Sequence, residues 1–293
     1  MPFHFGLRNA GALGGAYGLA PFEPIVATGG DEVDDVTIDG VLYRFHAFTS
    51  TGSSSFIVTD GGAGAGRFAD VLVVGSGAGS CRNGANANNS HGGGGAGGLV
   101  FRPELTLPVD TYTIVVGARA TFSTDDFVSP AAMAGDDSSA FGLVADAGAG
   151  GGNRDFLNGG NGGSGGGAGS DNEGNTGSGG SATQPQKAGD SGTFGFGNNG
   201  ANTSGSINGG GGGGAGGAAS GTAGGVGLDL SATFSTSFGV NGVFAAGGSA
   251  NVSSLSSPPQ NTGNGADAGV DDANGVLGSS GIVIVRYPLE RAA

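Results

Sequence analysis

The clearest alternation of hydrophobic and polar positions lies between residues 36 and 60. A short run at residues 36–38 is followed by Asp39-Gly40 and by a longer run at residues 41–48. Both positions of an Asp-Gly turn tolerate a positive φ, so this order predicts a β-hairpin. Alternate residues of its second strand would form two faces: Val41, Tyr43, Phe45 and Ala47 on one, and Leu42, Arg44, His46 and Phe48 on the other.

Further short runs rich in β-branched and aromatic residues follow along the chain. Residues 71–74 are apolar at every position, which is typical of a strand buried on both faces. Other expected strands lie at residues 55–59, 99–101, 105–107, 112–116 and 281–287. No stretch between residues 36 and 293 has the spacing of an amphipathic helix. The pattern predicts an all-β fold in which strands at 41–48, 71–74, 111–116 and 282–286 share one β-sandwich.

Between the expected strands lie long glycine tracts, because 70 of the 293 residues are glycine. The first covers residues 91–98, and the largest is an insertion at about 148–227, parts of which, such as 159–167, have a period of three. A left-handed extended helix has three residues per turn and no internal hydrogen bonds, so such glycine helices can bond to one another in a polyglycine II-like packing. A flexible Gly/Ser linker is the alternative. Phenylalanines such as Phe156 and Phe244 within or after the tracts favour the ordered packing. Collagen is excluded, since the period is not strict and only 10 prolines occur.

The first 35 residues differ from the rest of the chain. They mix aromatic residues with glycine and proline, show no sustained period and end in an acidic stretch; the aromatic residues are Phe3, Phe5, Tyr17 and Phe22. We interpret residues 1–35 as an N-terminal docking arm, with a frayed terminus as the alternative. Residues 36–293 then form one glycine-rich β domain, closed by the strand at 281–287.

Charge and composition exclude several classes of partner. The net charge of −14 opposes binding to nucleic acid, which requires clusters of Lys and Arg. No run of about 18 apolar residues is present, so no membrane insertion is expected. The N-terminus lacks the basic start and apolar stretch of a secretory signal. The single cysteine, Cys81, rules out an internal disulfide and suits synthesis in a reducing cytoplasm.

Sequence matches to chemical motifs are weak. The apolar run at 71–74 enters Gly75-Ser76-Gly77, but the polyglycine that follows cannot form the helix that a dinucleotide site needs. A G-x-S-x-G match at 162–166 lacks a strand–helix context, and the three histidines lie far apart. Residues 263–267 resemble half of a calcium-binding repeat, and the paired acids at 125–126, 136–137 and 271–272 are most simply solvated loop carboxylates. We therefore expect no catalytic, metal or cofactor site, while calcium binding by the Asp-rich loops stays open.

The order of these segments resembles a known family. It runs from the aromatic hairpin at 43–52 through the strand at 70–75 before polyglycine and the run at 112–117 to the closing Gly281-Ile-Val-Ile-Val-Arg-Tyr287. This order resembles the glycine-rich domain of structural proteins in tailed phages, marine ones among them, over about residues 40–288. More loosely, it is similar to the polyglycine-rich tail-fibre tip adhesins of some contractile-tailed phages.

The resemblance implies a virion protein made in the host cytoplasm and built into a tail fibre, a tail tip or the particle surface. Its first implication is a non-enzymatic adhesin that binds a saccharide or outer-membrane protein of the bacterial surface. A capsid or tail decoration protein is the second, and a virion-associated polysaccharide depolymerase a remote third. Other virion proteins and copies of the same chain, as a trimer for example, are the expected assembly partners. Exposed aromatics and amides on loop tips suit receptor binding, and the best candidates are Phe194, Phe196, Asn198 and Asn199. The two phenylalanines alternatively cap the side of a glycine bundle.

Overall fold

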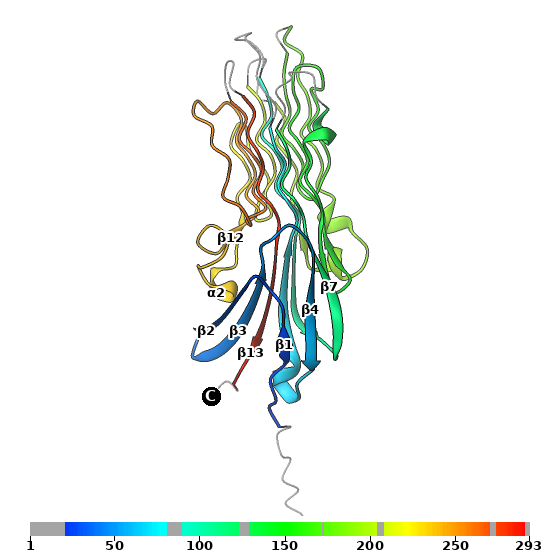
Figure 1. The fold of residues 1–293 in the computed structure, drawn as a ribbon. Coiled ribbons are helices and arrows are strands. Elements are labelled where there is room, and N and C mark those ends of the chain that lie inside the picture. Colours follow the sequence, from blue (N-terminus) through cyan, green and yellow to red (C-terminus); the bar gives the residue numbers. More distant parts are fainter. Residues whose placement is uncertain are drawn as a thin grey trace, which may run out of the picture.

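The computed structural model describes residues 21–80, 90–122, 129–171, 173–203, 208–269 and 274–290. Two parts are evident (Figure 1): a pair of antiparallel sheets at one end, and a bundle of extended, glycine-rich segments that runs from them to the other end. The predicted all-β fold is confirmed. Helical structure in the described residues is confined to single turns: η1 (Gly64–Arg67), η2 (Pro130–Met133), η3 (Gln184–Gln186), α1 (Asp190–Thr193) and α2 (Ser231–Phe234).

The larger sheet has six strands in the order β10-β6-β5-β13-β3-β2. Their bounds are β10 (Gly195–Phe196), β6 (Leu99–Thr106), β5 (Phe68–Val74), β13 (Ile282–Pro288), β3 (Val41–Phe48) and β2 (Glu32–Ile38). The closing strand β13 lies between β5 and β3 and pairs antiparallel with both. The β2–β3 hairpin turns at Asp39 and Gly40, whose φ values of 50° and 80° are the positive ones that the Asp-Gly pair predicted.

The smaller sheet has five strands in the order β1-β4-β7-β8-β9. Their bounds are β1 (Val26–Thr28), β4 (Gly52–Asp60), β7 (Asp110–Val116), β8 (Ser138–Ala140) and β9 (Leu143–Ala145). The two sheets face each other across a core of buried side chains that includes Phe48, Phe56, Val73, Ile114 and Val283. The strands predicted to share one sandwich therefore do so, with β7 in one sheet and β3, β5 and β13 in the other.

The outer face of the six-stranded sheet is also covered. Alternate residues of β5 and β13, such as Leu72 and Ile284, point away from the sandwich core into a second cluster. This cluster is closed by Phe234 of α2, by Phe238 and by Phe244 of β12 (Val243–Phe244), which pairs with β11 (Leu228–Asp229). Burial on both faces explains why β5 is apolar at every position from Val71 to Val74.

Beyond the sheets, the glycine-rich segments form a hydrogen-bonded lattice around the segment at 92–98. The N–H groups of this segment donate in rotation to three neighbouring segments, so that every third residue meets the same neighbour. The first neighbour accepts through Gly152, Ala149 and Asp146 from Gly92, Gly95 and Gly98. The second accepts through Gly210 and Gly213 from Gly93 and Ala96, and the third through Ala266 and Gly263 from Gly94 and Gly97. None of the glycines at 92–98 has a positive φ. The segment is thus a left-handed extended helix with three residues per turn, as in polyglycine II.

The carbonyl groups of the same segment face three other neighbours. Gly93 and Ala96 accept from Gly167 and Ser164, Gly95 and Gly98 accept from Ala78 and Gly75, and Gly94 accepts from Gly248. The central segment therefore bonds to six surrounding segments. This arrangement pairs the backbone polar groups that a buried glycine tract would otherwise leave unsatisfied.

Side chains are excluded from many of the lattice glycines by the closeness of neighbouring backbones. A Cβ atom placed on Gly167 would lie 1.8 Å from the carbonyl oxygen of Gly210, and one on Gly212 would lie 2.1 Å from that of Gly94. The predicted insertion at 148–227 contributes to this lattice, with a short excursion through η3, α1 and β10 to the edge of the sandwich. For its described residues, the ordered packing is confirmed over the flexible linker.

The predicted boundary of the arm at residue 35 needs correction. Within residues 1–35, β1 pairs with β4 and β2 pairs with β3, so these residues are edge strands of the two sheets. The acidic stretch did not indicate a strand because its side chains are exposed and its order comes from backbone pairing. Its charges also have defined partners: Asp35 bonds Arg44 Nε at 2.8 Å, and Asp31 accepts the N–H groups of Ser50 and Thr49, which lowers the Asp31 pKa. Phe3, Phe5 and Tyr17 lie outside the described residues.

Candidate functional site

The four residues predicted to bind a receptor lie on β10 or within three residues of it. Phe194 packs against the sandwich core, with the Arg102 guanidinium 4.6 Å above its ring centre. Phe196 is on β10, which pairs with the edge strand β6, and 38% of it is exposed. Asn198 Nδ2 donates to the Gly214 carbonyl at 2.7 Å, and Asn199 Oδ1 accepts from the Ala182 N–H at 2.8 Å. Phe194 thus contacts the sandwich core, and the two asparagine side chains bond to lattice backbone. Receptor binding by these residues and capping of a glycine bundle by the two phenylalanines both stay predictions.

Of the arm aromatics, only Phe22 is among the described residues. It is partly buried and precedes Glu23, whose backbone pairs with Ala63 beside η1. At the other terminus of the described chain, the Leu289 N–H donates to the Leu42 carbonyl. Both ends of the described chain therefore lie on the sandwich, at the end of the molecule away from the lattice (Figure 1).

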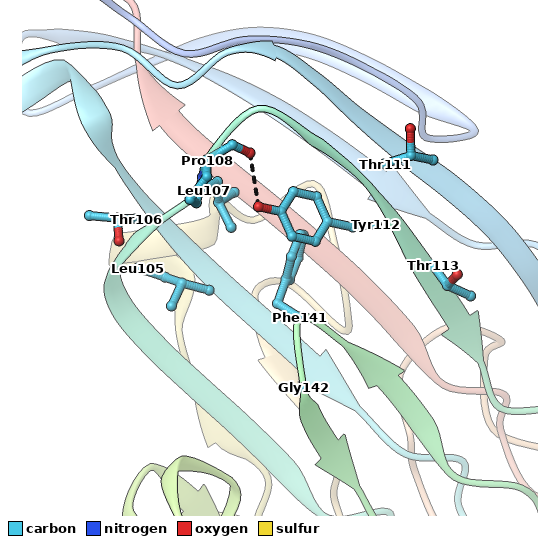
Figure 2. Close-up of a pocket in the computed structure, with 9 residues that line it drawn as sticks. All are labelled: Leu105, Thr106, Leu107, Pro108, Thr111, Tyr112, Thr113, Phe141 and Gly142. Carbon is cyan, nitrogen blue, oxygen red and sulfur yellow. Dashed lines mark hydrogen bonds between the residues drawn. The ribbon is translucent and has the colours of Figure 1, made fainter.

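A first pocket opens at the edge of the sandwich, where the β6–β7 and β8–β9 connections meet (Figure 2). Its volume is about 480 Å³, and Leu105, Leu107, Tyr112 and Phe141 supply its apolar lining. We call it the sandwich pocket. Figure 2 shows the Tyr112 hydroxyl bonded to the Pro108 carbonyl, at 2.9 Å, which closes one side of the hollow.

The aromatic wall of the sandwich pocket is fixed by the turn between β8 and β9. Phe141 and Gly142 adopt φ values of 53° and 77°, and a positive φ is uncommon for a bulky residue. The Phe141 ring lies 5.8 Å from that of Phe56 in the sandwich core and 5.0 Å from that of Tyr112. Ring packing thus holds the turn in place. Partial burial, with the nearby Asp110 carboxylate, raises the pKa of Tyr112, so this side chain is a neutral hydrogen-bonding group at pH 7.

A second pocket lies on the flank of the lattice, with a volume of about 520 Å³. We call it the lattice pocket, and its lining residues are Ser129, Pro130, Asp155, Phe156, Leu157, Asn158 and Gly160. Unlike the sandwich pocket, it combines an exposed aromatic ring with a carboxylate and an amide. From the sequence, Phe156 was interpreted only as a sign of order. The signal that it overlooked is the run Asn153-Arg-Asp-Phe156, a charged turn between two glycine tracts.

Asparagine and aspartate side chains along the lattice edges take the place of backbone carbonyls. At spacings of three residues they accept hydrogen bonds from backbone N–H groups of the adjacent segment: Asn158 from Ser178, Asn161 from Ser181, Asn264 from Ala246 and Asp267 from Ser249, at 2.7–2.9 Å. The half repeat at 263–267 that resembled a calcium site thus has Asn264 and Asp267 oxygens engaged in the lattice. Among the described residues, no group of three or more His, Cys, Asp or Glu side chains is placed to hold a metal ion.

The remaining motifs have structural explanations where they are described. After β5, Gly75, Ser76 and Gly77 continue as a lattice segment, bonded to Gly98, Asp136 and Ser279, where a dinucleotide site would require a helix. Asp137 Oδ1 accepts the Ala147 N–H at 2.7 Å. Cys81 and the acid pairs at 125–126 and 271–272 lie outside the described residues. In the described part of the chain, no helix is long or apolar enough to cross a membrane.

A family model described as a glycine-rich domain matches residues 49–288, which include strands of both sheets and the whole lattice. The chain belongs to this glycine-rich domain family. No curated protein matches the chain. The glycine-rich domain therefore covers the lattice and the strands that anchor it, while the β2–β3 hairpin precedes the matched region.

Proposed function

We propose that this glycine-rich domain protein is a structural component of a tailed-phage virion, a tail-fibre or tail-tip adhesin that binds the bacterial surface without catalysis. The observation that carries the proposal is the six-neighbour polyglycine lattice. Each extended segment rises about 3.1 Å per residue, so a few residues carry the chain well beyond the sandwich. The lattice holds its turns at fixed spacing through backbone hydrogen bonds, which leaves the side chains of those turns free to vary.

The two ends of the molecule suit different tasks in such an adhesin. The sandwich end carries both termini of the described chain, which favours it as the end attached to other virion proteins or to copies of the same chain. At lattice turns, polar side chains are held by local bonds. Asp171, for example, accepts the N–H groups of Glu173 and Asn175, and its pKa is lowered by the Asn175 side-chain amide together with these bonds. Turns ordered in this way lose little entropy when they bind a surface.

Binding without catalysis is proposed because side-chain oxygens of the candidate motifs that the structure describes are engaged in hydrogen bonds. The carboxylate of Asp137 and the side-chain oxygens of Asn264 and Asp267 accept backbone hydrogen bonds that the lattice requires. A residue that must keep such a bond is poorly placed to transfer protons in a reaction.

The test uses the fluorescently labelled full chain with a panel of Gram-negative strains, and it follows both adsorption and released reducing sugar. We expect saturable adsorption to some strains, competition with phage infection of those strains, and no released sugar. Absence of adsorption to every strain would favour the decoration protein of a capsid or tail. Release of oligosaccharide would favour the depolymerase.

A further inference from the structure

The lattice pocket displays an aromatic ring that is far more exposed than the rings of the cores. Phe45, Phe48, Phe56, Phe234 and Phe244 are at most 1% exposed, whereas Phe156 is 45% exposed. Because the Phe156 ring is exposed, it does not belong to the hydrophobic cores of the sandwich. It lines a hollow of about 520 Å³, a volume within the range of small-ligand sites.

The turn that carries Phe156 is built to hold it in place. Asn153 is fully buried, and its side-chain oxygen accepts the backbone N–H groups of Asp155 and Phe156 at 3.1 and 3.0 Å. The Asn153 N–H in turn donates to the Phe156 carbonyl at 2.9 Å. Fixing the backbone on both sides of the ring reduces the entropy that a ligand would have to remove on binding.

Polar groups of complementary type flank the ring. The Asp155 carboxylate is an acceptor at the pocket, 4.0 Å from Arg154 Nε. Asn158 Oδ1 accepts the Ser178 N–H at 2.8 Å, which orients the amide and leaves its Nδ2 as a donor. A sugar ring offers vicinal hydroxyls, each of which donates and accepts, and an apolar face of C–H groups that packs on an aromatic ring.

Gly160 lines the pocket, and a side chain there would be less crowded than at most lattice glycines. A Cβ on most lattice glycines would lie near 2 Å from a backbone atom, but one on Gly160 would meet the Cβ atoms of Ala149 and Pro130 at 3.1 and 3.2 Å. Lattice packing therefore comes close to tolerating alanine here. Pro130 also lines the pocket, so the added methyl group would occupy the floor between them.

We propose that the lattice pocket binds a neutral saccharide and, resting on the adhesin function proposed above, that it contacts the glycan of the bacterial surface. The neutral class follows from charge. The chain carries a net charge of −14, and the pocket itself presents the Asp155 carboxylate, so an acidic sugar would be repelled.

The binding test uses the full chain and three neutral probes, the methyl glycosides of glucose, galactose and mannose, with methyl glucuronide as the acidic counterpart. We expect at least one neutral glycoside to bind with a Kd of about 1 mM, as suits a single-ring site, and the glucuronide to bind more weakly. Titration by NMR at pH 7 reports both affinity and site. Absence of saturable binding by every neutral probe, or tighter binding of the glucuronide, would overturn the proposal.

Matched variants locate the site. Phe156→Ala and Gly160→Ala are each expected to weaken binding about tenfold or more, the first by removing the stacking face and the second by filling the floor. Phe122→Ala removes another exposed phenylalanine, which does not line the pocket, and should leave the affinity unchanged. Asp155→Asn tests the carboxylate in a chain whose ring is intact, in case the other variants fold poorly. Equal affinities of the wild-type and Phe156→Ala proteins would contradict the assignment.

Cell adsorption separates this proposal from the adhesin function. If Phe156→Ala loses glycoside binding but adsorbs to bacteria as the wild type does, the pocket is not the receptor contact and the adhesin function stands. If the wild type binds glycoside but adsorbs to no strain, the adhesin function fails and the saccharide site stands.

Discussion

The sandwich and the glycine lattice belong to one chain but exclude water from their backbones in different ways. In the sandwich, rings and β-branched side chains fill the space between two sheets, and the backbone bonds only along each sheet. In the lattice, almost no side chain separates neighbouring segments, and the backbone of the segment at 92–98 bonds in six directions. The comparison teaches that glycine, which is costly to order in isolation, becomes required where six backbones meet. The sandwich can respond to a change of side-chain volume by local repacking, whereas the lattice has few side chains to rearrange.

The largest effect is expected from a side chain placed inside the lattice. Gly212→Val would force its Cβ to within 2.1 Å of the Gly94 carbonyl oxygen, so we expect a loss of at least about 4–5 kcal/mol or failure to fold. Gly163→Val, whose Cβ would lie 2.1 Å from the Gly98 nitrogen, should behave alike. Urea unfolding measures the loss. Gly217→Ala is the control, because its added methyl group meets only the Val226 side chain, at 3.1 Å, and a comparable loss there would contradict the packing argument.

A core substitution in the sandwich should cost less and reveal whether the two parts unfold together. Phe56 is fully buried and packs edge-on against Phe48, Phe141 and His46. Phe56→Ala is expected to cost about 3–5 kcal/mol. Because β5 and β6 continue directly into lattice segments, amide hydrogen exchange should show both parts of the variant opening in one transition. Separate transitions would mean that the lattice is stable without the sandwich.

A smaller loss is expected at the lattice edge. Asn264→Ala removes the oxygen that accepts the Ala246 N–H at 2.9 Å and leaves this donor unpaired, at a cost of about 1–3 kcal/mol. Asn264→Asp keeps the acceptor and should lose much less. The measurement is thermal unfolding of the two variants side by side. Equal losses of stability would show that the hydrogen bond between Ala246 and Asn264 is not the cause.

The smallest effect is a pH dependence that arises in the sandwich. His46 is buried, with Nδ1 bonded to the Gly29 carbonyl and Nε2 to the Tyr287 hydroxyl, and burial lowers its pKa despite the Gly29 bond. The unfolded chain therefore takes up the proton more readily than the folded one. The contribution of neutral His46 to the free energy of unfolding is complete above the unfolded pKa of about 6.5. It declines as the pH falls below that value.

We expect stability to fall between pH 6.5 and 5.5, by at most about 1 kcal/mol for one proton, measured by urea unfolding at each pH. The control is His46→Gln, which cannot take up this proton and should lose less over the same interval. The same slope in both proteins would place the titrating group elsewhere.

Much of this architecture could be predicted because the sequence has two simple periods, each typical of one kind of backbone structure. The period of two at 41–48 and the all-apolar run at 71–74 predicted strands and their buried faces, and the period of three at 159–167 predicted the extended glycine segments. Which segments become neighbours could not be predicted, since glycine carries no side-chain information to distinguish one partner from another. The first part of β2, residues 32–35, was overlooked because its acidic side chains are exposed. The lattice pocket was overlooked because it exists only where residues 129–130 lie beside residues 155–160.

A helix with three residues per turn also restricts how the length of the lattice can change. Inserting one residue into the segment at 92–98 would rotate everything after it by about 120° and direct each N–H group toward the wrong neighbour. Inserting three would restore every direction and lengthen the segment by about 9 Å. Viable insertions and deletions within lattice segments should therefore come in multiples of three, matched in adjoining segments, while the turns between them can gain or lose single residues. The glycine-rich part would then lengthen or shorten by whole helical turns. Changes in the surface that it presents would be confined to the turns that connect its segments.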